Sequence, residues 1–142
     1  MIQPESFRVT RMALAALAAH AEADAPHEAC GVLVGATEVA TAAWRLPNEA
    51  ADPSREYLMA GGLCAAQRRW RTAGLRLLAY YHSHPSGPAR PSAADRMRSP
   101  SCPDLPHLIV GLAPTPEVHA WVTHAWCGAR LEIALRIVIV AA

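Results

Sequence analysis

No apolar run in this 142-residue sequence reaches the roughly 18 residues that a membrane-spanning helix needs. The hydrophobic C-terminal segment 131–142 is interrupted by Glu132 and Arg136. An excess of positive charge is lacking too, because 13 side chains of the Lys and Arg type are matched by 12 of the Asp and Glu type. We therefore expect no membrane partner and no nucleic-acid partner, since nucleic-acid binding calls for a basic surface.

The sequence also lacks any Cys-x-x-Cys pair, which excludes the usual cysteine-based metal and redox motifs. An even number of cysteines permits disulfides in an oxidising compartment, but a domain of this size does not require them. We expect thiols that form no disulfide, and we expect Cys30 to pack in the core rather than to act as a nucleophile. The four cysteines are widely spaced, at Cys30, Cys64, Cys102 and Cys127.

Internal repeats, low-complexity segments and interdomain linkers are absent from the sequence, so we expect residues 1–142 to form a single domain. The N-terminal segment admits two interpretations. Arg8 and Arg11 precede the apolar stretch 12–19, and the triplet 21–23 could pass for a signal-peptidase site. The same residues fit an amphipathic first helix capped by Thr10. We favour the helix, which should cover the sheet, and we expect a cytoplasmic protein.

Hydrophobic periodicity predicts an α/β domain with a mixed central sheet flanked by helices, because strands outnumber helices and the helices fall before and between them. The expected helices cover residues 11–23, 62–72 and 92–97. The expected strands cover residues 7–9, 31–34, 39–46, 56–59, 75–81, 107–112, 118–123 and 130–140. Four arginines gather around the second helix, either as a solvated face or as a docking patch for an acidic protein: Arg68, Arg69, Arg71 and Arg76.

The most informative stretch of the sequence follows the apolar strand 75–81. His82 and His84 are two residues apart at the end of this strand, and alternate side chains of a strand point to the same face. Two imidazole rings can therefore converge on one ion. The segment 85–91 is rich in Pro and Gly, which predicts a loop that brings the start of the next helix back over the strand end.

Ser92 and Asp95, at the start of that helix, also admit two interpretations. Their spacing is that of an ordinary helix cap, in which a serine binds backbone N–H groups and an acid three residues later reciprocates. Beside two histidines, however, Asp95 could supply an oxygen ligand. Three mixed nitrogen and oxygen ligands, with the fourth position left to water, are typical of a catalytic zinc site. Such a site needs a carboxylate base, and Glu28, just ahead of an apolar strand, is the candidate.

Together these residues resemble the signature of the JAMM (MPN-plus) metalloproteases. The sequence carries Glu28 before an apolar strand, and later His82-x-His84, seven intervening residues, Ser92, two residues and Asp95. The resemblance implies a deaminase-like JAMM/MPN fold in which His82, His84 and Asp95 bind zinc. It also implies that Glu28 is the general acid and base and that Ser92 helps to stabilise the tetrahedral oxyanion.

The same resemblance implies a substrate class. Members of this family cleave amide or isopeptide bonds after the Gly-Gly tail of a ubiquitin-like protein. Some small prokaryotic members act on sulfur carrier proteins and release cysteine from a carrier–cysteine conjugate. We expect the segment 48–57 to be the sheet edge to which an extended tail adds as a strand. A cell-wall or phage-type peptidase and a non-catalytic MPN scaffold are the alternatives, and we expect a monomer or a homodimer.

Overall fold

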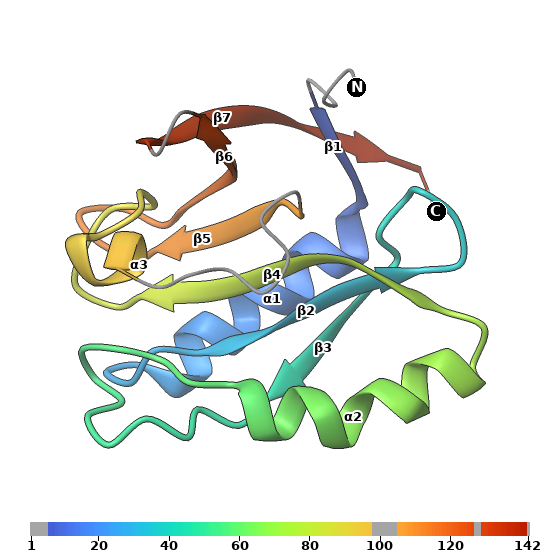
Figure 1. Cartoon of the computed structure of the whole chain (residues 1–142), viewed down its shortest axis with the longest axis horizontal. Helices are drawn as coiled ribbons and strands as arrows, with labels where there is room; N and C mark the ends of the chain where they lie inside the picture. The colour runs from blue at the N-terminus through green and yellow to red at the C-terminus, as the bar shows by residue number, and fades with distance from the viewer. Residues whose placement is uncertain (1–5, 98–104, 127–128, 142) are drawn as a thin grey trace.

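The computed structural model describes residues 6–97, 105–126 and 129–141. Within these ranges, seven strands and three helices follow one another along the chain (Figure 1). The strands are β1 (Ser6–Thr10), β2 (Cys30–Gly35), β3 (Ala42–Leu46), β4 (Arg76–His84), β5 (His107–Gly111), β6 (Glu117–Trp126) and β7 (Ala129–Val140). The helices are α1 (Arg11–Asp24), α2 (Ala60–Thr72) and α3 (Ala93–Met97).

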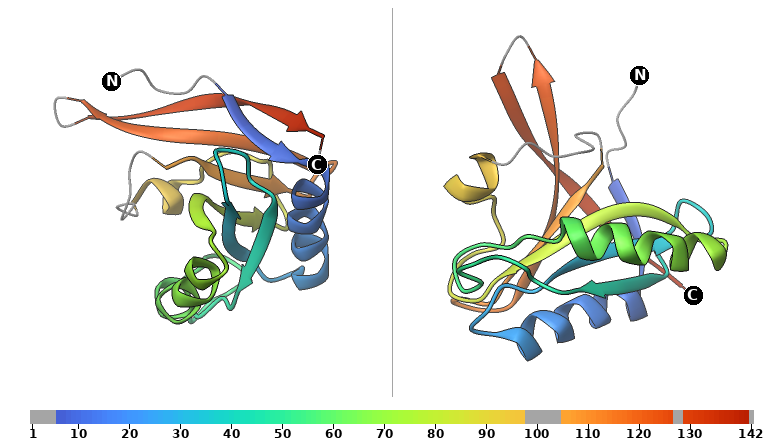
Figure 2. Two further views of the ribbon diagram at one scale, coloured as in Figure 1. Left: turned by 90° about the vertical axis from the view of Figure 1, so that its right-hand side faces the viewer. Right: turned by 60° about the horizontal axis from the view of Figure 1, so that its bottom comes forward.

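The strands form one mixed sheet in the order β1-β7-β6-β5-β4-β2-β3. β1 is parallel to β7 and β4 is parallel to β5, whereas the other neighbouring strands are antiparallel. Helices α1 and α2 lie on opposite sides of the part of the sheet that contains β2 and β3 (Figure 2). The expected α/β class, with a mixed sheet flanked by helices, is therefore confirmed.

Strand β2 shows why helices are needed on both faces of the sheet. All six of its residues are buried, and their side chains alternate between two hydrophobic cores. Leu33 packs in the core that contains Leu17 of α1, whereas Val32 and Val34 pack in the core that contains Trp70 of α2. A strand that is buried on both faces is a continuous apolar run, as the sequence of β2 is.

Helix α1 begins as the sequence predicts. The hydroxyl of Thr10 accepts a hydrogen bond from the Ala13 N–H at 3.2 Å, which is the contact of a helix N-cap. The helix buries Leu17 and Ala21 against the sheet, so the segment is part of the hydrophobic core. In the part of the chain that the structure describes, no helix has the length and hydrophobicity to cross a membrane.

The two cysteines within the described residues form no disulfide, as expected. Cys30 lies in buried strand β2, where its thiol donates to the Leu46 carbonyl with an S···O distance of 3.7 Å. Cys64 is exposed on α2. The predictions for Cys102 and Cys127 fall outside the described residues.

One expected strand is wrong, because residues 56–59 form no strand. Their backbone bonds to the loop that precedes them: the Leu58 N–H donates to Asn48 Oδ1 at 3.1 Å, and the Glu49 N–H donates to the Leu58 carbonyl at 2.8 Å. Strand β4, in contrast, is longer than expected and includes His84. The side chain of Asn48 thus competes with the sheet for these backbone groups.

The register between β2 and β4 determines where the predicted site residues meet. The two strands are antiparallel, with Cys30 opposite His82. The residues just before β2 therefore lie beside the end of β4. Glu28 lies two residues before Cys30, the first residue of β2, so the register brings it to the two histidines although they are far apart in the sequence.

Candidate metal centre

The two histidines at the end of β4 point to the same face of the sheet, as the strand period predicts. The Nε2 atoms of His82 and His84 are 3.0 Å apart. The Nδ1 atom of His84 lies 2.9 Å from the carbonyl oxygen of Pro88. A carbonyl oxygen only accepts, so this contact places the proton of a neutral His84 ring on Nδ1 and leaves the lone pair on Nε2. That lone pair faces His82.

Helix α3 brings a carboxylate to these nitrogens. Asp95 Oδ2 lies 3.2 Å from His82 Nε2 and 3.1 Å from His84 Nε2. The same oxygen accepts from the Ser92 N–H at 2.9 Å, and the Asp95 N–H donates to Ser92 Oγ at 3.1 Å. The helix-cap and the ligand interpretations of Ser92 and Asp95 are therefore compatible, because the cap holds the Asp95 carboxylate next to the histidines.

Three donor atoms from His82, His84 and Asp95 thus form a triangle with sides of 3.0, 3.1 and 3.2 Å. A tetrahedral zinc ion with bonds of about 2.0 to 2.1 Å separates its ligand atoms by about 3.3 Å. Two imidazole nitrogens and a carboxylate oxygen are also ligand types that zinc accepts, and they leave the fourth position open. These three residues therefore fit a zinc ion with an open position.

Glu28 lies beside this triangle. One of its carboxylate oxygens and one ring nitrogen from each of His82 and His84 lie within 4.8 Å of one another, so these three residues also form a possible metal-binding set. Asp95 fits the role of third ligand better, because its oxygen is 3.1 to 3.2 Å from both nitrogens. The carboxylate of Glu28 is placed to act on a molecule bound next to the ligands.

The backbone around Glu28 is tied to two other segments. The Glu28 N–H donates to the Pro53 carbonyl at 2.7 Å, and Asn48 Nδ2 donates to the Glu28 carbonyl at 2.9 Å. The next residue, Ala29, donates its N–H to Ser83 Oγ at 2.8 Å and accepts from the Ser83 N–H at 2.9 Å. Only 6% of Glu28 is exposed, so its carboxylate is buried on a backbone with little freedom.

Asn48 holds the loop between β3 and α2 in place. Its Nδ2 donates to the carbonyls of Glu28 and Glu56 at 2.9 and 3.0 Å, and its Oδ1 accepts from the N–H groups of Ala50 and Leu58, both at 3.1 Å. No spacing pattern in the sequence marks this role, because the partners are main-chain atoms that any residue type could supply. The sequence placed Asn48 only at the start of the segment 48–57, which was expected to be a sheet edge.

A third histidine, His107, supports His82 from the neighbouring strand. β4 and β5 are parallel, and His107 at the start of β5 is opposite Tyr80. His107 Nε2 lies 2.6 Å from His82 Nδ1. The ring of Tyr57 stacks on His82 with 4.3 Å between the ring centroids, and its centroid is 6.0 Å from that of His107. His107 lies outside the motif spacing, so the sequence did not identify it as a site residue.

The contacts within the triangle shift two pKa values. Burial raises the pKa of Asp95, but the adjacent His82 and His84 side chains outweigh burial and hold that pKa well below its ordinary value. Burial lowers the pKa of His84, but the adjacent Asp95 carboxylate and the Pro88 carbonyl outweigh it and raise that pKa. Asp95 is therefore ionised, as a metal-binding carboxylate must be.

The candidate metal centre opens into a cleft of about 550 Å³. Glu28, His84 and Ser92 line it, so three of the predicted site residues face this space. Two arginines, Arg55 and Arg90, also line the cleft. The structure thus brings all five predicted site residues together at one end of β4.

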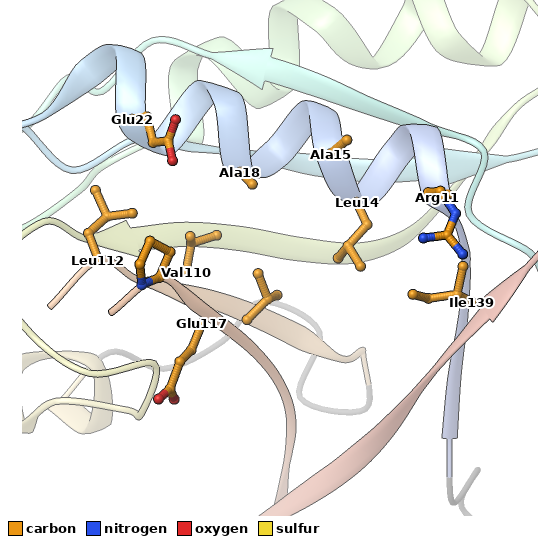
Figure 3. Close-up of a pocket in the computed structure, with 11 residues that line it drawn as sticks. Arg11, Leu14, Ala15, Ala18, Glu22, Val110, Leu112, Glu117 and Ile139 are labelled. Atoms are coloured by element: carbon orange, nitrogen blue, oxygen red, sulfur yellow. The ribbon is translucent and has the colours of Figure 1, made fainter. Parts of the chain in front are cut away.

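A second hollow, of about 320 Å³, lies between α1 and strands β5 to β7 (Figure 3). Its walls are mostly apolar, with Leu14 on α1 and Val110 and Ile139 on the strands (Figure 3). Its described lining contains neither His nor Cys, and its two acids come from separate elements. This hollow has no group of converging polar side chains.

Comparisons with known proteins identify the family of the chain. Residues 10–134 match the family of prokaryotic homologs of the JAB domain. Over 104 residues the chain is 36% identical to a desampylase from Haloferax volcanii, a match that covers 71% of this chain and 74% of that protein. Over 78 residues it is 42% identical to a probable TtuB-protein conjugate cleaving protease from Thermus thermophilus, covering 54% of this chain and 52% of that protein.

Solved structures have the same fold. A protein from Desulfitobacterium hafniense matches with a TM-score of 0.75 and 28% identity, over 95% of this chain and 93% of that chain. A JAB1/MPN domain protein from Archaeoglobus fulgidus matches with a TM-score of 0.56 and 20% identity, over 94% of this chain and 98% of that chain, which is a likeness of fold. The chain belongs to the prokaryotic JAB-domain family, and the resemblance seen in the sequence is confirmed.

Proposed function

We propose that the protein is a zinc-dependent hydrolase that cleaves the amide or isopeptide bond after the C-terminal tail of a ubiquitin-like or sulfur carrier protein. The observation that carries the proposal is the triangle of donor atoms from His82, His84 and Asp95 beside the buried carboxylate of Glu28. Relatives that are a desampylase and a probable conjugate cleaving protease support a protein conjugate as the substrate.

In this proposal His82, His84 and Asp95 hold the zinc ion. When bound, the ion supplies a Lewis acid that makes water more acidic and a carbonyl carbon more electrophilic. Glu28 removes the proton from the attacking water and then delivers it to the departing amine. Water is the nucleophile, so the reaction needs no acyl-enzyme intermediate.

Ser92 stabilises the oxyanion in this proposal. Its Oγ accepts a hydrogen bond from the Asp95 N–H at 3.1 Å, and a hydroxyl that accepts still has its own proton to donate. Ser92 also lines the cleft beside Glu28 and His84. A donor that the helix cap holds in position beside the reacting carbonyl stabilises the charge that develops on its oxygen.

The substrate tail enters the cleft between two loops. One loop contributes Ser54 and Arg55, and the other contributes residues 84–88 and 90–92. The segment 48–57 is not a strand, so it does not present the preformed sheet edge expected from the sequence. We therefore propose that an extended Gly-Gly tail lies in the cleft, whose walls include Pro88 and Pro91 and favour a tail without side chains.

The two arginines of the cleft favour a finer version of this function, in which the protein releases cysteine from a carrier–cysteine conjugate. A cysteine joined through its amine keeps a free carboxylate, whereas a lysine side chain within a protein does not. Arg55 and Arg90 both line the cleft, and guanidinium groups bind carboxylates in a bidentate manner.

The test compares two conjugates of one carrier protein, joined either to a lysine side chain or to cysteine. The zinc-loaded protein is incubated with each, and the products are identified by mass spectrometry. Release of the intact carrier from either conjugate supports the proposed hydrolase, and release from the cysteine conjugate alone supports the finer version. Cleavage of neither by a zinc-bound protein contradicts the proposal, and cleavage of peptidoglycan peptides instead favours a cell-wall peptidase.

A further inference from the structure

The two histidines of the candidate metal centre are supported in different ways. The Nδ1 atom of His84 contacts a backbone carbonyl, that of Pro88, at 2.9 Å. The Nδ1 atom of His82 contacts a side chain, that of His107, at 2.6 Å. A substitution of His107 removes the contact to His82, whereas no side-chain substitution removes the carbonyl that contacts His84. The role of the His82 contact can therefore be tested by mutation.

We propose that His107 is a positioning residue for the metal centre: its Nε2 accepts the Nδ1–H of His82 and so fixes the tautomer and the orientation in which His82 binds zinc. This inference rests on the proposed zinc site. A histidine that binds a metal through Nε2 carries its proton on Nδ1, and that proton needs an acceptor. His107 Nε2 lies 2.6 Å from His82 Nδ1 and is the acceptor in this proposal.

The packing around His82 makes this support important. Only 1% of His82 is exposed, so bulk water does not replace a lost acceptor. The Tyr57 ring stacks on His82 with 23° between the ring planes, which limits tilting of the imidazole. The His107 ring is nearly perpendicular to His82, at 82°, and therefore meets its edge. Stacking restrains the plane of His82, and His107 determines which nitrogen carries the proton.

The position of His107 follows from the sheet rather than from the motif. β5 pairs with β4 in parallel, with His107 opposite Tyr80 and Ile109 opposite His82. The side chain of His107 therefore reaches across to His82 from two pairs earlier in the register, on the same face of the sheet. A partner of this kind, outside the metal ligands, typically changes metal affinity by about 10-fold to 100-fold when it is mutated.

The experiment compares three variants of the full chain. His107→Phe keeps an aromatic ring but removes the acceptor, whereas His107→Gln offers an amide oxygen near the position of Nε2. The matched control is His119→Phe on the adjacent strand β6, because His119 is exposed and contacts Glu117 at 3.0 Å. For each protein the zinc dissociation constant is measured by chelator competition, and the absorption spectrum is recorded with cobalt in place of zinc.

We expect His107→Phe to raise the zinc dissociation constant by about 10-fold to 100-fold and to change the cobalt spectrum. His107→Gln should restore most of the affinity, and His119→Phe should match the wild type. A dissociation constant and a cobalt spectrum that are unchanged in His107→Phe would overturn the proposal. An equal loss of zinc affinity in His107→Phe and His107→Gln would also overturn the proposal, because it would show that the packing of the His107 ring matters and its acceptor does not.

A measurement on the unmodified protein covers the case in which His107→Phe does not fold. In the zinc-loaded wild type with ¹⁵N-labelled histidine, the NMR spectrum should show a protonated Nδ1 on His82 and a scalar coupling across the hydrogen bond to His107 Nε2. An unprotonated His82 Nδ1, or no coupling, contradicts the inference. Zinc affinity is measured without substrate, so this test does not depend on the proposed function. A zinc-bound protein that cleaves no conjugate refutes the proposed function but does not decide the role of His107.

Discussion

Two buried histidine clusters lie on opposite faces of strand β4. On the face covered by α1, His20 Nδ1 contacts the Tyr81 hydroxyl at 2.7 Å, and His20 Nε2 contacts Asp24 Oδ2 at 3.0 Å. On the other face are His82 and His84, whose Nε2 atoms are 3.0 Å apart. Both clusters contain a buried histidine and a carboxylate, so composition does not separate them, although 41% of the Asp24 side chain is exposed against 14% of Asp95.

The clusters differ in where their lone pairs point. Each nitrogen of His20 has its own partner, and the two partners lie at opposite ends of the ring. In the other cluster, the contact of His84 Nδ1 with the Pro88 carbonyl directs the Nε2 lone pair of His84 towards His82, and the proposed bond from His82 Nδ1 to His107 directs the Nε2 lone pair of His82 to the same point. The Asp95 oxygen points there as well. Three converging lone pairs repel one another unless a cation lies between them, which is why only this cluster is a candidate metal centre.

The largest expected effect is on catalysis at the His82 face. Glu28→Gln should lower the rate of conjugate cleavage by about 10²-fold to 10⁴-fold, because it removes the group that transfers the proton. Zinc binding should persist, since His82, His84 and Asp95 are unchanged. The measurement is the initial rate of cleavage together with the zinc content, and Glu22→Gln on the exposed side of α1 is the control. A Glu28→Gln variant with wild-type rate refutes the assigned role.

A smaller effect is expected from Asn48, which supports the loop beside the metal centre. Asn48→Ala removes hydrogen bonds to five main-chain groups, which are part-buried or exposed, and each such bond contributes about 0.5 to 1.5 kcal/mol to stability. We expect a lower free energy of unfolding and a lower cleavage rate, with zinc content preserved. Chemical denaturation measures the free energy of unfolding. Asn48→Asp keeps the acceptor oxygen and should lower the free energy of unfolding less than Asn48→Ala does.

Tyr81→Phe tests the His20 face alone. The substitution removes the hydroxyl that contacts His20 at 2.7 Å and should lower the free energy of unfolding by about 1 to 2 kcal/mol. Zinc affinity should be unchanged, because Tyr81 points away from its neighbour His82. The unfolding free energy and the zinc dissociation constant are measured on the same preparation. A tenfold loss of zinc affinity would show that the two faces are not independent.

The smallest expected effect is a pH dependence from His20. Burial lowers the pKa of His20 below its ordinary value of 6.5, against the raising effect of Asp24, and Arg45 adds to the lowering. A lowered pKa means that the unfolded chain binds the proton more readily than the folded chain. The stability from neutral His20 is therefore fully present above pH 6.5 and is lost as pH falls towards the folded pKa.

The measurement is the difference in unfolding free energy between the zinc-free wild type and His20→Gln from pH 7.5 to pH 5. Subtraction of the two proteins removes the contribution of titrating groups that do not contact His20. We expect the excess of the wild-type unfolding free energy over that of His20→Gln to shrink as pH falls. A difference that is constant with pH contradicts the account of His20.

The sequence indicated which side chains the structure brings together at the end of β4, because most of the necessary geometry is local. The two-residue spacing of His82 and His84 places both rings on one face of a strand, and the spacing of Ser92 and Asp95 is that of a helix cap. Each pattern is short, and each is found in the structure. The approach of Glu28 depends instead on the antiparallel register of β2 and β4, which only the family resemblance implied.

Other parts of the site could not be predicted because they depend on contacts between distant segments. His107 meets His82 through the register of β5 against β4, and no local pattern in the sequence specifies that register. The strand expected at residues 56–59 is absent because Asn48, eight or more residues earlier, takes up the backbone groups that a sheet would use. Local periodicity describes an apolar segment correctly but does not identify which partner its backbone will bond.

The most direct test of the central claim is the zinc content of three proteins after reconstitution and dialysis: the wild type, Asp95→Ala and Asp24→Ala. Each variant removes the carboxylate of one histidine cluster, so the pair compares the two faces of β4. The wild type and Asp24→Ala should each retain about one zinc ion per chain, and Asp95→Ala should retain almost none. Stoichiometric zinc in Asp95→Ala, or equal loss in both variants, would contradict the claim that the His82 face alone binds the metal.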